Sequence, residues 1–318
     1  MNLKETFLKE KQTIKSSELT HIEDNIPSPL KEIDDLYGAA DALSIKNSQK
    51  HEQNLKNVAY LAPAIAFLFL IYDEVEQHWL IVICIILIFI LIYAFRSSRS
   101  ERNHEKYLEY RVLAESLRTQ YFLSIAGAKT KVTDIMPWFI KNDVKWVYQI
   151  LSGLDLSKPV EKRPVVNLWI NDQRDYHFSA FQRAVKHKET NDLIERIVLG
   201  VTVLTYFITL AFEAYMYLYP VLDAVTAGKI RAGLKISIGT MSAITIFLSN
   251  YYGKMSLSSK VEEHRRMGML FEKTSIQIRN NKYVEREEDI VDLARECLIE
   301  NTTWYAHQKK NKPDLDVE

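Results

Sequence analysis

The chain has 318 residues, and its 41 lysines and arginines are balanced by 41 aspartates and glutamates. This balance gives no indication of an anionic partner, so any argument for one has to rest on local clusters of charge. Its two cysteines, Cys84 and Cys297, lie in an apolar run and on a charged stretch, which argues against a disulfide framework or a cysteine metal site. The 47% hydrophobic content is ordinary for a soluble protein, but it is concentrated in four apolar blocks.

Residues 1–36 are predicted to form a polar arm or helix. Leu3 and Phe7 are too sparse to give a packed face, and the charged beginning of the chain is unlike a secretory signal peptide. Two prolines, Pro27 and Pro29, indicate a break before helical periodicity begins.

Residues 37–133 are predicted to form a first membrane hairpin followed by a stalk helix. Its apolar blocks, 57–72 and 79–95, are about the minimum needed to cross a bilayer. Their connector is short and acidic, while lysines and arginines flank the pair, so the positive-inside rule puts both termini in the cytoplasm. The alternative is a buried helical hairpin of a soluble protein, but the uncharged run from Trp79 to Phe95 argues against it.

The stalk is predicted as one helix from Arg96 to Ala126, because no proline or glycine interrupts it. Apolar and small residues recur along it at alternating intervals of three and four, which is typical of a helix packed along another helix. They are Tyr107, Tyr110, Ala114, Leu117, Tyr121 and Ser124. A second such series follows the last apolar block: Leu257, Val261, His264, Gly268, Phe271, Ser275 and Ile278.

The rest of the chain completes an all-α membrane protein with four transmembrane helices in two hairpins and an extended cytoplasmic helical body. Residues 134–190 are predicted as a central cytoplasmic helical insertion. Residues 191–283 hold the second hairpin, with spans at about 197–219 and 234–252, and its stalk helix. Residues 284–318 form a last helix and a polar tail.

Polar side chains recur inside the second hairpin and are candidates for lining a pore. Such residues either face a water-filled path or pack between helices, and serine and threonine favour packing because they can bond to the preceding turn. Glu213 and Lys235 lie towards the outer ends of their spans and can pair or form a charged ring. The full set is Thr202, Thr205, Thr209, Glu213, Lys235, Ser242, Thr245 and Ser249.

Two groups of cationic residues are candidates for binding an anionic ligand. Arg111 and Arg118 lie seven residues apart on one helix face, with Glu115 placed to neutralise both. The central insertion mixes basic and aromatic residues, as a nucleotide or single strand requires; its candidates are Lys141, Lys145, Arg174 and Tyr176. The competing interpretation is an ordinary helical domain with its tryptophans in the core.

The sequence offers little support for catalysis. The eight histidines show no metal-ligand spacing, and His177 and His264 have the setting of solvated or interhelical residues. Phosphate-binding loops, nucleophile elbows and paired catalytic carboxylates are missing. We therefore expect a protein that is not an enzyme and has no cofactor.

Several short motifs resemble those of SLATT-type membrane effectors, which are associated with nucleotide-signal synthases and sensors. They are Asp41-Ala42-Leu43, the run from Tyr110 to Arg118, Tyr121-Phe122, Ala126-Gly127, Trp169-Ile170, Asp172-Gln173, Tyr176, Met267, Leu270-Phe271, Glu300-Asn301, Trp304 and His307. Their order around four apolar blocks carries the resemblance. It implies a pore-forming effector of bacterial antiviral defence, and the arrangement is similar to the two-component Hailong type, in which a nucleotidyltransferase accompanies the membrane protein.

The combined expectation is a homo-oligomeric, ion-conducting protein of the bacterial inner membrane, gated by a nucleotide or oligonucleotide. The alternative is a non-conducting membrane scaffold whose cytoplasmic helices dock a partner protein. Glycine-rich nucleotide-binding loops are lacking before the first apolar block, so the signal has to be read by the cytoplasmic helices or by a separate protein.

Overall fold

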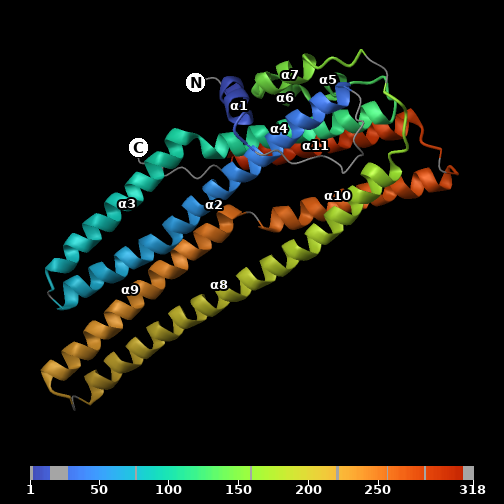
Figure 1. Ribbon diagram of the computed structural model, residues 1–318. Coiled ribbons are helices and arrows are strands. Elements are labelled where there is room, and N and C mark those ends of the chain that lie inside the picture. The colour runs from blue at the N-terminus through green and yellow to red at the C-terminus, as the bar shows by residue number, and fades with distance from the viewer. Residues whose placement is uncertain are drawn as a thin grey trace. The chain divides into compact units, whose positions relative to one another are not determined.

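A computed structural model describes residues 3–14, 28–75, 77–157, 160–219, 222–255, 257–282 and 284–310. Helices make up its regular structure, and no described residue belongs to a strand. The helices are α1 (Leu3–Lys11), α2 (Ser28–Val75), α3 (Trp79–Glu101), α4 (Asn103–Ile125), α5 (Val132–Ile135), α6 (Trp138–Asp143), α7 (Lys145–Ser152), the π-helix η1 (Val166–Asn171), α8 (Asp172–Leu218), α9 (Ala224–Met255), α10 (Leu257–Asn280) and α11 (Glu287–Lys310) (Figure 1). The all-helical prediction is confirmed for this part of the chain.

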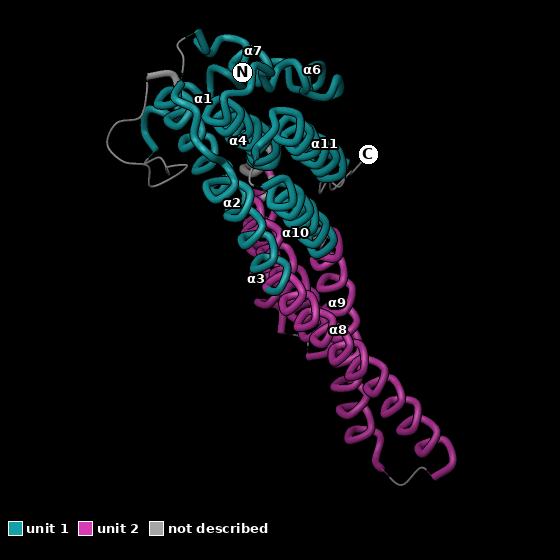
Figure 2. Tube along the Cα trace, turned by 90° about the vertical axis from the view of Figure 1, so that its right-hand side faces the viewer, with its two compact units in different colours: residues 1–50, 102–182, 260–318 teal, residues 51–101, 183–259 magenta. Residues whose placement is uncertain are grey.

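The chain divides into two compact units, which Figure 2 shows in different colours. Unit 1 consists of residues 1–50, 102–182 and 260–318, and unit 2 of residues 51–101 and 183–259. Both α2 and α8 therefore supply residues to each unit.

Unit 2 carries the apolar segments. Three helical stretches, Leu30–Val75, Val166–Leu218 and Ala224–Asn280, are long and apolar enough to cross a membrane, whereas the apolar part described for α3, Trp79–Ala94, is shorter. Large apolar side chains lie on the outside, and Phe207 is 64% exposed. Because such residues would be costly in water, this surface indicates membrane association.

Unit 1 is built around α4, which is buried on almost every side. Its predicted seam residues Tyr110, Ala114, Leu117 and Tyr121 are all buried, as are many residues between them. Helices α11, α7 and α5 pack against α4. The heptad-type pattern thus marks part of a helix that is enclosed by several neighbours rather than by one.

The structure corrects two predicted helix boundaries. The expected helix from Arg96 to Ala126 is divided at Arg102, which has a left-handed φ of 53°. Helix α3 ends just before Arg102, and Arg102 is the N-terminal cap residue of α4. A left-handed residue cannot continue a right-handed helix. Helix α9 begins at Ala224, ten residues before the predicted span, so Lys229 and Arg231 lie on a helix instead of a loop.

The expectation that Leu3 and Phe7 form no packed face is also wrong. Both are buried, and the Phe7 ring centroid lies 5.4 Å from that of Tyr110 and 5.8 Å from that of Trp146. Two apolar residues one turn apart are enough here because α4 and α7 supply aromatic partners. The predicted break at Pro27 falls outside the described residues, and so does the polar tail after Lys310.

Candidate functional site

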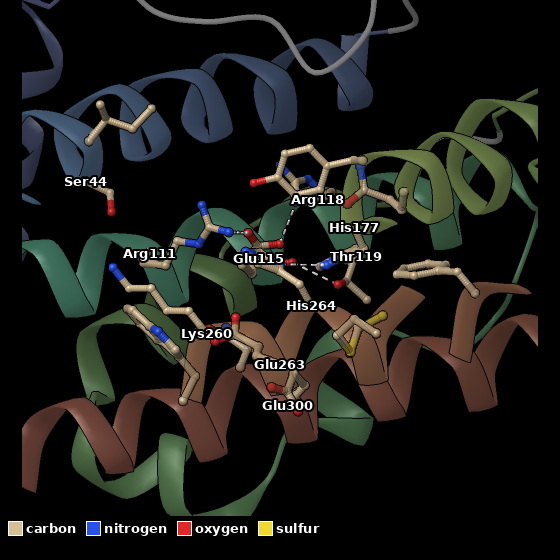
Figure 3. Close-up of a pocket in the computed structure, with 18 of the residues that line it drawn as sticks. Ser44, Arg111, Glu115, Arg118, Thr119, His177, Lys260, Glu263, His264 and Glu300 are labelled. Atoms are coloured by element: carbon tan, nitrogen blue, oxygen red, sulfur yellow. Dashed lines mark hydrogen bonds and ion pairs between the residues drawn. The ribbon is translucent and has the colours of Figure 1, made fainter. Parts of the chain in front are cut away.

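A cavity of about 350 Å³ lies within unit 1 (Figure 3). Helices α2, α4, α10 and α11 and the beginning of α8 line it. This volume lies in the range of small-molecule sites in proteins. Its wall combines charged side chains with aromatic ones, so the cavity is the strongest candidate for a ligand site in unit 1.

The central group of the cavity is a carboxylate held between two guanidinium groups. Glu115 lies 2.7 Å from the Nη2 atom of Arg111 and 2.9 Å from the Nη1 atom of Arg118. Helix geometry produces this arrangement, because residues three and four apart on α4 share a face. The three side chains are only 18–33% exposed, so solvent screens them less than a surface pair.

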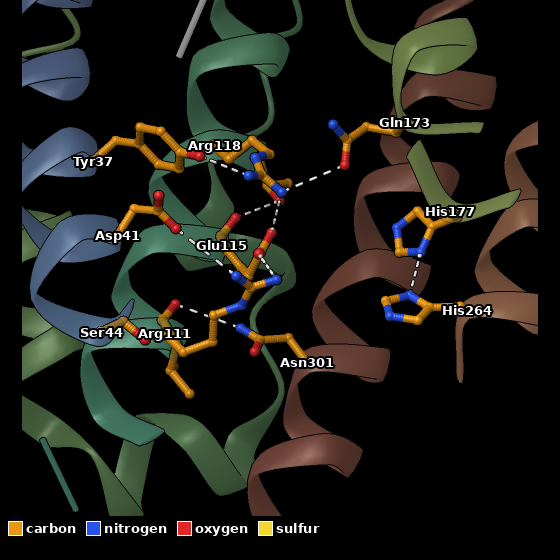
Figure 4. Close-up of polar contacts among 12 residues, drawn as sticks. Tyr37, Asp41, Ser44, Arg111, Glu115, Arg118, Gln173, His177, His264 and Asn301 are labelled. Atoms are coloured by element: carbon orange, nitrogen blue, oxygen red, sulfur yellow. Dashed lines mark hydrogen bonds and ion pairs between the residues drawn. The ribbon is translucent and has the colours of Figure 1, made fainter. Parts of the chain in front are cut away.

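Arg118 also joins α4 to two other helices (Figure 4). Its guanidinium donates a hydrogen bond of 2.6 Å to the Tyr37 hydroxyl of α2 and one of 3.4 Å to the Gln173 amide oxygen of α8. Arg111 lies 3.8 Å from Asp41 of α2. The arginines thus hold the two helices that continue into unit 2.

The charges of this cluster stabilise one another. Burial lowers the pKa of both arginines, but the Glu115 carboxylate outweighs it, so their pKa values are raised. For Glu115, burial raises the pKa of the carboxyl. Arg111 and Arg118 together lower this pKa by more than burial raises it, so the net shift is downward. All three groups are therefore ionised at neutral pH, and an anionic ligand has to compete with Glu115 for the arginines.

Two histidines face each other in the same cavity. The Nδ1 atoms of His177 on α8 and His264 on α10 are 3.1 Å apart, which requires one to donate and the other to accept a hydrogen bond. Burial and the neighbouring His264 lower the pKa of His177 to about 4. His177 is therefore neutral at neutral pH, and the pair has the interhelical setting, one of the two that the sequence predicted for these histidines.

Helix α10 contributes further charged groups that the sequence did not single out. Glu263 and Lys260 line the cavity, and the structure shows no hydrogen bond or ion pair for either among the described residues. Burial raises the pKa of the Glu263 carboxyl. The series of seam residues that includes His264 predicts which part of α10 faces other helices. Lys260 and Glu263 lie within one turn of His264, so this series could have indicated them.

Aromatic rings form part of the cavity wall. Trp304 meets Tyr107 edge to face at a centroid distance of 5.5 Å, and Trp169 stacks on Phe122 at 5.2 Å. Cys297 also lines the cavity, but burial raises the pKa of its thiol, so it is a poor nucleophile at neutral pH. Among the described residues no cluster of three His, Cys, Asp or Glu side chains can hold a metal ion.

Three of the six predicted ligand-binding residues line the cavity: Arg111, Arg118 and Tyr176. The others lie outside its lining. Lys141 Nζ lies 5.7 Å from the centroid of the Tyr148 ring, Lys145 is exposed on α7, and Arg174 pairs with Asp175 and Glu272. The competing interpretation placed the tryptophans in the core of an ordinary helical domain. It holds for Trp146 and Trp169, which are buried, whereas Trp138 is exposed.

The predicted pore-lining residues are occupied with contacts inside unit 2. Thr202 and Thr245 join α8 to α9 through hydroxyls 2.9 Å apart. Thr205 and Thr209 each donate a hydrogen bond to a carbonyl of the preceding turn of α8. Ser242 meets the Tyr206 hydroxyl at 3.1 Å, and Ser249 donates to Glu195 at 2.6 Å.

Glu213 and Lys235, which the sequence allowed either to pair or to form a charged ring, do not pair with each other within the chain. Glu213 pairs with Arg231 at 2.7 Å, because the early start of α9 places that arginine on a helix. Lys235 pairs instead with the acidic last turn of α2, lying 2.9 Å from Asp73 and in contact with Glu74.

Comparison with known proteins gives no match to a family model, to a curated protein or to a solved structure.

Proposed function

We propose that the chain is a bacterial inner-membrane effector of antiphage defence, which forms a homo-oligomer and conducts ions under the control of a nucleotide or oligonucleotide bound in the unit 1 cavity. In this proposal four helices cross the membrane as two hairpins with both termini in the cytoplasm. A separate nucleotidyltransferase supplies the signal.

The observation that carries the proposal is the shared use of α2 and α8. Each helix supplies residues to the cavity, Ser44 from α2 and Gln173 and His177 from α8, and each continues into an apolar membrane segment. A ligand controls a channel only by binding its open and closed states unequally. Helices that belong to both regions provide a route by which cavity contacts can alter the membrane segments.

The cavity chemistry favours a ligand with phosphate and base-like parts. Arginine forks match phosphate oxygens, and Lys260 adds a cation without an ion-pair partner among the described residues. The rings of Tyr107, Tyr176 and Trp304 offer surfaces on which a base can stack. An incoming phosphate would take the arginines from Glu115 and loosen their contacts with α2 and α8, and this exchange of partners is the proposed switch.

One observation favours the scaffold alternative. The polar side chains predicted to line a pore already have hydrogen-bond or ion-pair partners within the chain. Membrane helices use such contacts to hold together, and they need no water path. A non-conducting scaffold that docks a partner protein through unit 1 is therefore the second candidate.

Ion flux from proteoliposomes separates the two functions. The probes are oligodeoxynucleotides of two to six residues, tested on the wild type, on Arg118→Gln and on Arg295→Gln, an exposed arginine of α11 as matched control. We expect flux that responds to a probe in the wild type and the control but not in Arg118→Gln, with binding that weakens as salt rises. Absence of flux under every condition, with assembly intact, would leave the scaffold.

A second comparison tests the route of the ions. A Thr209→Leu and Ser242→Leu double variant places bulk on the polar faces of α8 and α9. If these faces line the path, flux falls while assembly is kept. Lower assembly yield would show instead that they pack helices, and unchanged flux with unchanged assembly would exclude both roles.

A further inference from the structure

A second cavity, of about 450 Å³, lies within unit 2 between α2 and α9. Its lining is mostly apolar and includes Pro63, Ala64, Ile244 and Leu248. One end is different, because Lys56, Tyr60, Tyr251 and Tyr252 meet there. The cavity therefore has a polar, aromatic end and an apolar body, as a binding site for an amphiphile requires.

The two helices run antiparallel past the cavity and approach each other closely at the end opposite Lys56. Near Thr240 the helices come so close that a Cβ atom on Gly239 would lie 2.5 Å from the Leu70 Cδ1 atom. The α2 lining extends from Lys56 to Phe67, which is about 16 Å along a helix. That length is about half of the ~30 Å hydrocarbon core, so the cavity matches one leaflet of a bilayer.

The polar end has the composition of a membrane interface. Tyrosine and lysine are typical anchors at the level of lipid headgroups. Lys56 keeps 41% of its side chain exposed, although it pairs with Glu52 at 2.7 Å. A lysine in this position attracts an anionic headgroup, with Glu52 as its intramolecular competitor.

Pro63 removes one backbone hydrogen bond from the stretch of α2 that lines the cavity. Because proline has no N–H group, the carbonyl of Ala59, one turn earlier, lacks the hydrogen bond that its place in α2 would otherwise give it. Ala59 lines the cavity next to Tyr60. A hydroxyl of a glycerol-type headgroup can supply the missing donor, and such a donor is valuable at membrane depth because water is scarce there.

We propose that the α2–α9 cavity binds one acyl chain of an anionic glycerophospholipid, with the phosphate at Lys56 and the chain directed towards Thr240. The site differs from the unit 1 cavity in location and in ligand chemistry. It does not depend on the proposed function, since a channel or a scaffold can hold the lipid equally well.

Native mass spectrometry of the full chain in detergent tests the site. The two probes are phosphatidylglycerol and phosphatidylcholine with identical acyl chains. We expect the wild type to retain phosphatidylglycerol about fivefold more strongly, since one lysine contact contributes an effect of this order. Equal retention of the two lipids by the wild type would overturn the proposal.

Four variants assign the effect to named residues. Lys56→Gln should lose the preference for phosphatidylglycerol, and Glu52→Gln should increase it because the competing carboxylate is removed. Ala64→Phe fills the apolar body and should lower retention of both lipids. Lys229→Gln, an exposed lysine at the beginning of α9, should behave as the wild type.

Misfolding cannot imitate this pattern, because Glu52→Gln is expected to gain lipid. A preference that persists in Lys56→Gln shows that the headgroup lies elsewhere. Retention by Ala64→Phe at the wild-type level shows that the chain does not occupy the cavity. Either result would overturn the proposal.

Discussion

Glu115 is the residue on which the unit 1 cavity depends, because its carboxylate is the counter-ion of two partly buried arginines. Glu115→Gln leaves Arg111 and Arg118 close together without this charge. Breaking a buried ion pair costs about 3–5 kcal/mol and an exposed one about 0–1 kcal/mol, so we expect a loss of about 2 kcal/mol for this partly exposed cluster.

The same variant should bind anions more tightly, because a phosphate no longer competes with Glu115. Thermal unfolding and oligonucleotide binding measure the two effects on one preparation. Glu105→Gln on the same helix is the matched control, since its pair with Arg102 is more exposed. A lower unfolding temperature of Glu115→Gln without any gain in oligonucleotide binding would show that the arginines stabilise the fold and do not bind anions.

His177 predicts a dependence of stability on pH. Burial and His264 lower its pKa from 6.5 to about 4 in the folded state, so the unfolded chain binds the proton more tightly. Stability is therefore fully present above pH 6.5 and is lost as pH falls towards 4, with an upper limit of about 3 kcal/mol. Arg111, Arg118, Glu115 and His264 face this group.

The unfolding temperature at a series of pH values between 4.5 and 7.5 checks this dependence. His177→Asn should show a flatter profile than the wild type, and the difference between the two profiles removes the contribution of Glu115 and other carboxyls. His187→Asn, an exposed histidine of the same helix, should retain the wild-type profile. Parallel profiles for all three proteins would contradict the predicted shift.

At the scale of helices, α2 and α9 approach each other closely at Gly239, where Leu70 occupies the space that a side chain would need. Gly239→Leu forces atoms into the space that Leu70 occupies, and overpacking of this kind costs about 1–3 kcal/mol. Gly200→Leu on α8 is the control, because no atom lies within 4 Å of its added Cβ. Thermal unfolding in detergent should separate the two, and an equal effect would show that α2 and α9 are not in close contact.

Prediction from sequence succeeds where the information is local. The spacing of Arg111, Glu115 and Arg118 on one helix is enough to place them together, and the seam of α4 follows from its periodicity. The partners Tyr37 and Gln173 are 81 and 55 residues away from Arg118, so no helical pattern indicates them. The break at Arg102 is also unmarked, since arginine has no preference for a left-handed conformation.

For the whole molecule, the channel proposal requires several copies of the chain. One chain offers α8 and α9 as candidates for lining a pore, and two helices cannot enclose a water path by themselves. Cyclic symmetry around a central axis is the simplest arrangement that closes such a path. We therefore expect the protein purified in detergent to be larger than its 37.1 kDa monomer.

Light scattering, corrected for the bound detergent, measures this mass directly. Glu115→Gln and Lys56→Gln should keep it, because both changes lie within cavities of a single chain. A monomer at micromolar concentration would eliminate conduction through a shared pore and leave the scaffold as the function that the membrane segments support.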